Sequence, residues 1–182
     1  MKVINIIIGF VFLSIVACKK DSNISTSTTT TSSFEAYSTA FVNNGTFPKL
    51  FTCDSTGISP TISWKNAPTG TNAYALTMHT IPSTGVKHVY IVLYNLPATL
   101  NSIPQAVSNT GIFGINTVNG KMSYTPPCSQ GPGAKIYVIT VYALSKQPVI
   151  SVASTAVTMD VLLSAMSGIT LGTSAITVSY TK

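Results

Sequence analysis

Few side chains in this sequence are of the types that perform acid–base, nucleophilic or metal chemistry. The 182 residues include two histidines, His79 and His88, together with three cysteines and four acids. Hydrolysis by paired carboxylates needs two acids in one site, and the later acids Glu35, Asp54 and Asp160 offer no convincing pair. Neither a Gly-x-Ser-x-Gly elbow nor a glycine-rich phosphate loop of the usual kinds occurs. We therefore predict that the protein is not an enzyme and needs no cofactor.

The composition excludes several classes of protein. Charged residues make up only 8% of the chain and hydrophobic residues 45%, and the formal net charge is +6. All basic residues are lysine, scattered from Lys2 to Lys182, whereas a sequence-specific nucleic-acid binder gathers Arg and Lys on one face. Only one apolar run approaches the roughly 20 residues of a membrane-spanning helix. We therefore expect one small globular domain that does not bind nucleic acid.

The N-terminal residues have the pattern of an export signal. Lys2 precedes an apolar stretch that ends at Cys18, and residues 15–18 (IVAC) resemble the bacterial lipobox, in which the cysteine is acylated and becomes the first residue. We predict a lipoprotein signal peptide over residues 1–17, lipidation of Cys18, and a Ser/Thr-rich flexible tether over residues 18–33. The expected location is the bacterial cell envelope, at the outer membrane or cell surface rather than the inner membrane. An ordinary signal peptide that contains a cysteine is the alternative.

The two remaining cysteines, Cys53 and Cys128, form an even pair in an exported protein. We favour a disulfide between them, closing a loop of about 75 residues and contributing about 4 kcal/mol in the chain-entropy model. A free thiol at either position is the alternative, and with His88 as base it would suit a cysteine-dependent hydrolase. No short-spaced ligand pair accompanies these residues, so a zinc site is not expected.

Hydrophobic periodicity predicts a mainly β domain. Residues 89–96 (VYIVLYNL) and 136–144 (IYVITVYAL) are almost continuously apolar, as expected of strands buried on both faces. Residues 73–78 form a further short strand, and residues 34–41 and 174–180 alternate as half-exposed strands do. One helix is expected between Thr158, which can cap it, and Gly168.

Four sequence segments, taken in order, resemble motifs of one known family. Residues 51–64 (FTCDSTGISPTISW) are similar to "TCDG…SPPLSW", and residues 88–98 (HVYIVLYNLPA) to "HWVVYNIPA". Residues 124–137 match "Y.GPCPP.G.HRY", and residues 142–144 match the end of "LYAL". These motifs are those of bacterial phosphatidylethanolamine-binding-like proteins, relatives of the Raf kinase inhibitor protein. The resemblance covers residues 34–182 and implies an antiparallel Greek-key β-sandwich with a short C-terminal helix.

In that family, a surface cavity binds phosphate or a phospholipid headgroup, which implies a ligand site here. His88 matches the first histidine of the family site, Lys135 stands in place of the second, and Tyr137 matches its tyrosine. An acidic turn of the family is replaced by residues 78–82, which contain no carboxylate. The implied ligand-binding residues are His88, Pro126, Pro127, Lys135, Tyr137 and His79.

These replacements make the expected pocket more cationic than that of the family. Lys135 adds a point charge, and the loss of the acids removes the partner of an ethanolamine ammonium, so we expect a small anion or phosphate monoester as ligand. Each residue also has a structural interpretation: a core position for His88 and Tyr137, a loop position for His79, a solvated one for Lys135. The leading hypothesis is a membrane-anchored binding module. The alternative is a protein-interaction module that inhibits a kinase or protease.

Overall fold

The computed structural model describes residues 32–82, 85–130 and 132–182. The expected signal peptide, Cys18 and almost all of the expected tether therefore lie outside the described residues. Within the described ranges, no helix has the length and apolar character required to cross a bilayer.

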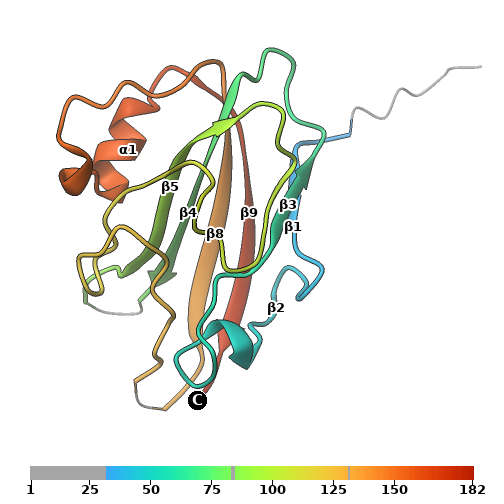
Figure 1. Ribbon diagram of the computed structural model, residues 1–182. Coiled ribbons are helices and arrows are strands. Elements are labelled where there is room, and N and C mark those ends of the chain that lie inside the picture. Colours follow the sequence, from blue (N-terminus) through green and yellow to red (C-terminus); the bar gives the residue numbers. More distant parts are fainter. Residues whose placement is uncertain (1–31, 83–84, 131) are drawn as a thin grey trace, which may run out of the picture. The chain divides into compact units, whose positions relative to one another are not determined.

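The domain is built from two β-sheets (Figure 1). The larger sheet has six strands in the order β2-β9-β8-β4-β5-β7, with the bounds Gly45–Thr46, Thr170–Tyr180, Lys135–Leu144, Ala73–Ile81, Val89–Pro97 and Ile112–Phe113. The smaller has three strands in the order β1-β3-β6, with the bounds Glu35–Tyr37, Ile62–Lys65 and Ser102–Ile103. All pairings are antiparallel except the short one between β2 and β9. The mainly β, antiparallel architecture expected from the sequence is confirmed.

The helical segments are short. In the part of the chain that the structure describes, two 3-10 turns, η1 (Lys49–Phe51) and η2 (Ser154–Ala156), accompany one α-helix, α1 (Met159–Ala165). Thr158 caps α1, because its side-chain oxygen accepts a hydrogen bond from the Val161 backbone N–H at 3.2 Å. The helix lies late in the chain as expected, although β9 follows it and is the last element.

The long strands lie where they are predicted, while the first strand is shorter than expected. β1 covers only three residues, Glu35–Tyr37, of the predicted strand over residues 34–41. The chain turns away at Ser38, whose hydroxyl donates a hydrogen bond to the Thr61 carbonyl and accepts one from the Ala40 N–H. This local side-chain bonding competes with continuation of the strand.

The main core lies between the two sheets and is rich in aromatic rings. Trp64 of β3 packs on Tyr74 of β4, with ring centroids 4.9 Å apart. Near the other end of the sheet, Phe47 contacts both Phe51 and Tyr137, at 5.6 and 6.1 Å between centroids. These contacts join η1 to the start of β8, and so support the end of the sheet at which the cavity described below opens.

The opposite face of the six-stranded sheet is covered only in part. Helix α1 packs on this face over β5 (Figure 1), through a second cluster that contains Met159, Leu162 and Met166. β5 is accordingly buried on both faces, as predicted. The same prediction for β8 is wrong: its burial alternates, because α1 lies over β5 rather than over β8. The outward side chains at the start of β8 are therefore accessible.

Candidate functional site

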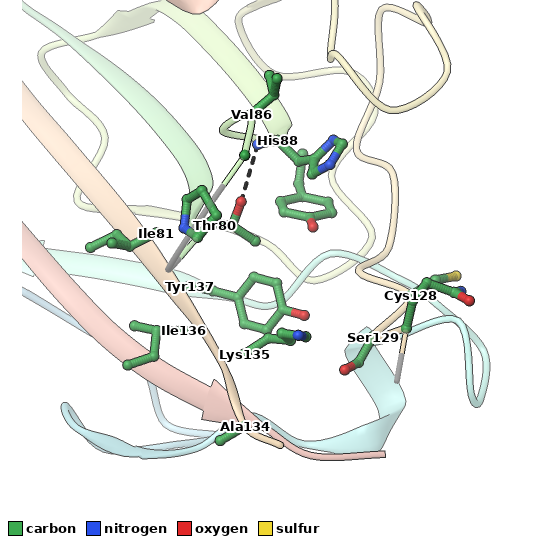
Figure 2. Close-up of a pocket in the computed structure, with 14 residues that line it drawn as sticks. Thr80, Ile81, Val86, His88, Cys128, Ser129, Ala134, Lys135, Ile136 and Tyr137 are labelled. Atoms are coloured by element: carbon green, nitrogen blue, oxygen red, sulfur yellow. Dashed lines mark hydrogen bonds between the residues drawn. The ribbon is translucent and has the colours of Figure 1, made fainter. Parts of the chain in front are cut away.

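A cavity of about 630 Å³ opens at the end of β4 and the start of β8 (Figure 2). Three stretches of chain and one residue of β5 form its walls: Thr80, Ile81, Pro82, Gly85, Val86 and His88; Tyr90; Cys128, Ser129 and Gln130; and Ala134, Lys135, Ile136 and Tyr137. It is within the size range of roughly 300–1,000 Å³ that is usual for small-molecule sites.

Two tyrosines contribute phenol groups to the cavity. The rings of Tyr90 and Tyr137 meet edge to face with centroids 5.5 Å apart, and both residues are buried. Burial raises the pKa of the Tyr90 phenol to about 12. Burial also raises the pKa of Tyr137, with smaller contributions from Tyr90 and Tyr180. Both hydroxyls therefore remain protonated at neutral pH and are able to donate hydrogen bonds.

His88 is held by its backbone, while its side chain is exposed to the cavity. Its N–H donates to the Thr80 hydroxyl at 3.0 Å, and its carbonyl accepts from the Thr80 N–H at 2.9 Å. These two bonds tie the residue before β5 to the end of β4. The imidazole is thus presented at a fixed point of the wall (Figure 2).

The disulfide between Cys53 and Cys128 fastens the second wall to the domain. The two sulfurs are bonded at 2.02 Å, and the Cys53 N–H donates to the Pro127 carbonyl at 3.0 Å. The next residue, Ser129, is only 3% exposed, and its hydroxyl has no hydrogen-bond partner among the described residues. In Figure 2 this hydroxyl points from the wall toward the β8 side of the cavity. A buried hydroxyl without a partner is rare in folded proteins, and a bound ion or water would supply the partner.

Lys135 brings the positive charge. It is the first residue of β8, is half-buried, and shares a face of the strand with Tyr137 because side chains alternate along a strand. The Lys135 ammonium and the Tyr137 hydroxyl point in the same direction in Figure 2. None of the lining residues is Asp or Glu.

Asp54, which follows the disulfide residue Cys53, is already engaged outside the lining. Its carboxylate accepts a hydrogen bond from the Tyr180 hydroxyl at 2.8 Å and lies 3.4 Å from the Lys182 ammonium. The hydrogen bond from Tyr180, followed by Lys182, holds the pKa of this carboxyl below its usual range. The cavity is therefore cationic and rich in donors, without a carboxylate of its own.

The structure brings some of the residues singled out in the sequence to the cavity and leaves others outside. His88, Lys135 and Tyr137 line it, whereas Pro126, Pro127 and His79 do not. The two prolines lie behind the wall, where the Pro127 carbonyl bonds the Cys53 N–H. Sequence reasoning missed Tyr90 and Ser129. Tyr90 is two residues after His88, so the alternation of side chains along an extended chain could have indicated it, but nothing in the sequence distinguished Ser129 from the other serines.

His79 lies next to Thr80 on β4, with its Nδ1 buried and without a partner in the described part of the chain. Burial, reinforced by the charge of Lys87, lowers the pKa of this imidazole. The unfolded chain therefore binds a proton more readily than the folded one, and stability is lost as the pH falls below about 6.5.

We expect the melting temperature of the protein to fall between pH 7 and pH 5, and this fall to be smaller in His79→Gln. Thermal unfolding followed by circular dichroism at a series of pH values measures it. Val149→Gln, at an exposed position outside the cavity, is the control and should keep the wild-type dependence. If the melting temperature of His79→Gln depended on pH as that of the wild type does, the loss of stability could not be assigned to protonation of His79.

Within the described ranges, no three His, Cys, Asp or Glu side chains come together in a group that could hold a metal ion.

A scan against family models matches residues 37–181 to the model described as "Phosphatidylethanolamine-binding protein". The chain belongs to the phosphatidylethanolamine-binding protein family. The family resemblance expected from the sequence motifs is thereby confirmed, and the domain has the ligand-binding fold of this family.

Relatives within the family have similar length. The chain is 34% identical over 117 residues to a UPF0098 protein of Aquifex aeolicus, covering 61% of this chain and 68% of the relative. It is 30% identical over 149 residues to a UPF0098 protein of Chlamydia muridarum, covering 79% and 95%.

Solved structures support the same assignment. A putative phosphatidylethanolamine-binding protein homologue of Chlamydia trachomatis superimposes with a TM-score of 0.74 at 25% identity, over 82% of this chain and 97% of that one. Escherichia coli YbcL, described as a new member of the mammalian phosphatidylethanolamine-binding protein family, shares the fold with a TM-score of 0.72 at 18% identity, over 82% and 98%.

Proposed function

We propose that this family member binds a small phosphate-bearing anion in the cavity between β4 and β8 and does not catalyse its conversion. The observation that carries the proposal is the set of lining groups: the Lys135 ammonium, the His88 ring, and the hydroxyls of Tyr137, Tyr90 and Ser129, with no carboxylate among the lining residues. Each of these groups can donate a hydrogen bond.

The charge balance favours a monoester or free anion over a zwitterionic headgroup. A phosphate oxygen gains a charge-assisted bond from Lys135, which acts as a point charge and does not demand a planar partner. An ethanolamine ammonium would need an acceptor or a carboxylate, and the lining provides no Asp or Glu. The buried hydroxyl of Ser129 would gain its missing partner from a bound phosphate.

The pairing of the cysteines argues against the hydrolase alternative. A cysteine nucleophile must be a thiolate, and both Cys53 and Cys128 are in the disulfide. The proposal therefore assigns Cys128 a structural role in the cavity wall.

A thermal-shift titration tests the proposal. At a hundredfold excess over the dissociation constant, inorganic phosphate should add about 2.7 kcal/mol of stability, or roughly 5–10 °C. Glycerophosphoethanolamine should add less. Ser129→Ala should weaken phosphate binding without lowering the melting temperature of the free protein, because it deletes an unpartnered hydroxyl. The absence of any shift with phosphate or phosphoethanolamine would overturn the proposal.

We also propose that the domain is held at the bacterial cell envelope by lipid on Cys18. The support is in the sequence: the IVAC motif at residues 15–18 and the polar Ser/Thr-rich tract that follows. Several acyl chains on one cysteine anchor firmly, since each buried CH₂ contributes about 0.8 kcal/mol. Incorporation of a labelled fatty acid, lost in Cys18→Ser, is the test.

A further inference from the structure

The cavity has a second, apolar part that phosphate binding does not use. Three large aliphatic side chains of its lining are exposed: Ile81 is 58% exposed, Val86 78% and Ile136 41%. Pro82 lines the cavity beside them. We call these four residues the apolar lip.

Strand geometry explains why the lip adjoins the donors. Ile81 of β4 is paired with Ile136 of β8, and the preceding pair in the ladder is Thr80 with Tyr137. Because side chains alternate between faces, the isoleucine pair lies on the opposite face of the sheet from Tyr137. The cavity wraps around this end of the sheet and touches both pairs. In Figure 2, Ile81 and Ile136 lie to the left, while the polar ends of Tyr137 and Lys135 point to the right, toward the wall that carries Ser129.

Within residues 32–82, 85–130 and 132–182, nothing covers the lip. Helix α1 and its apolar cluster lie over β5 and the beginning of β4, at the other end of these strands. Exposed aliphatic residues are ordinary when they are scattered singly, but a group of them at the mouth of a cavity marks a contact surface.

The size of the cavity also exceeds the needs of a bare anion. Cavities of roughly 300–1,000 Å³ accommodate drug-sized molecules, and this one measures about 630 Å³. Inorganic phosphate would occupy the donor end alone and leave the lip in water.

We infer that the ligand is a phosphate monoester with an apolar substituent, alkyl or aryl, whose phosphate lies at Lys135 and whose substituent lies on the apolar lip. This inference rests on the proposed function and adds the substrate class. The phosphate is bound by the donors of Lys135, Tyr137 and Ser129, and the substituent removes Ile81, Val86 and Ile136 from water. The absence of acids from the lining matches an apolar substituent, which has no positive charge to neutralise.

A chain-length series tests the inference. The purified protein is titrated calorimetrically with inorganic phosphate and with ethyl, butyl and hexyl phosphate. Full burial would raise the affinity about fourfold per CH₂. For a lip open on one side we expect about twofold per CH₂, and thus about sixteenfold over the four CH₂ groups that separate ethyl from hexyl phosphate. In Ile81→Ser/Val86→Ser this gradient should disappear, while the affinity for inorganic phosphate stays unchanged.

The control is Val149→Ser. Val149 is 79% exposed, close to the 78% of Val86, but it does not line the cavity. It should keep the full gradient. Phosphate binding with no gradient in the wild type would overturn the inference and leave the proposed function standing, whereas no binding of any ligand would remove both. The last measurement uses vesicles of phosphatidylcholine with phosphatidic acid. If the wild type binds these vesicles, Ile81→Ser/Val86→Ser does not, and the soluble esters show no gradient, the lip would be assigned to a membrane surface instead.

Discussion

Replacing Lys135 by methionine is expected to weaken phosphate binding tenfold to a hundredfold. Methionine keeps most of the length and apolar stem of the side chain while it removes the charge. A hydrogen bond to a charged group contributes about 1.5–3 kcal/mol, and the lining has no carboxylate that already neutralises this ammonium. Calorimetric titration with inorganic phosphate measures the loss directly.

Lys146→Met is the matched control, because Lys146 is an exposed lysine just beyond the other end of β8. It changes the net charge equally and should leave the dissociation constant unchanged. Raising the ionic strength should weaken binding by the wild type more than by Lys135→Met, since screening acts on the charge that the variant lacks. Equal affinities of the two lysine variants would show that the charge at Lys135 does not reach the ligand.

Loss of the disulfide is expected to be the largest change in stability. The bond joins residues separated by 75 positions, and the chain-entropy model assigns such a loop about 4 kcal/mol. For a domain of this size, Cys53→Ser/Cys128→Ser should therefore melt roughly 8–16 °C lower than the wild type. Phosphate affinity should fall as well, because the Cys128–Ser129 wall loses its covalent tie to Cys53.

Chemical reduction supplies the control for the disulfide prediction. Tris(carboxyethyl)phosphine should bring the wild type to the melting temperature of the double serine variant, and should have no effect on the variant itself. A thiol titration of the unfolded, unreduced protein should detect no free thiol at Cys53 or Cys128. A melting temperature that hardly responds to reduction would mean that the loop is held by its other contacts, such as the Pro127–Cys53 backbone bond.

Much of the architecture is predictable from periodicity, because strand pattern is a local property. The apolar runs at β4, β5 and β8, the alternation at β9 and the cap at Thr158 all appear where the sequence indicates them. The family motifs are likewise a property of linear order, and the match over residues 37–181 confirms them. The shortened β1 departs from its pattern because the Ser38 side chain bonds the backbone instead.

The candidate site was predictable only in part. The resemblance singles out His88, Lys135 and Tyr137, and all three line the cavity. It cannot place His79, because the position along the strand decides what reaches the cavity. The cavity touches only the last two residues of β4, Thr80 and Ile81, and His79 lies one residue further from the end of the strand.

Other features of the site depend on contacts between distant segments. In the sequence, nothing distinguishes Ser129 from the other serines. In the structure, the Cys53–Cys128 disulfide and the hydrogen bond between the Cys53 N–H and the Pro127 carbonyl hold it, buried, at the cavity. The apolar lip exists because Ile81 and Ile136 are paired across the ladder and because α1 lies over β5. The sequence by itself thus determined the strands, the family and the chemical types at three cavity positions. The tertiary structure decided which groups face the cavity and which apolar residues stay uncovered beside them. These features follow from the register of the strands and the placement of the helix, and register and placement depend on packing between elements far apart in the chain.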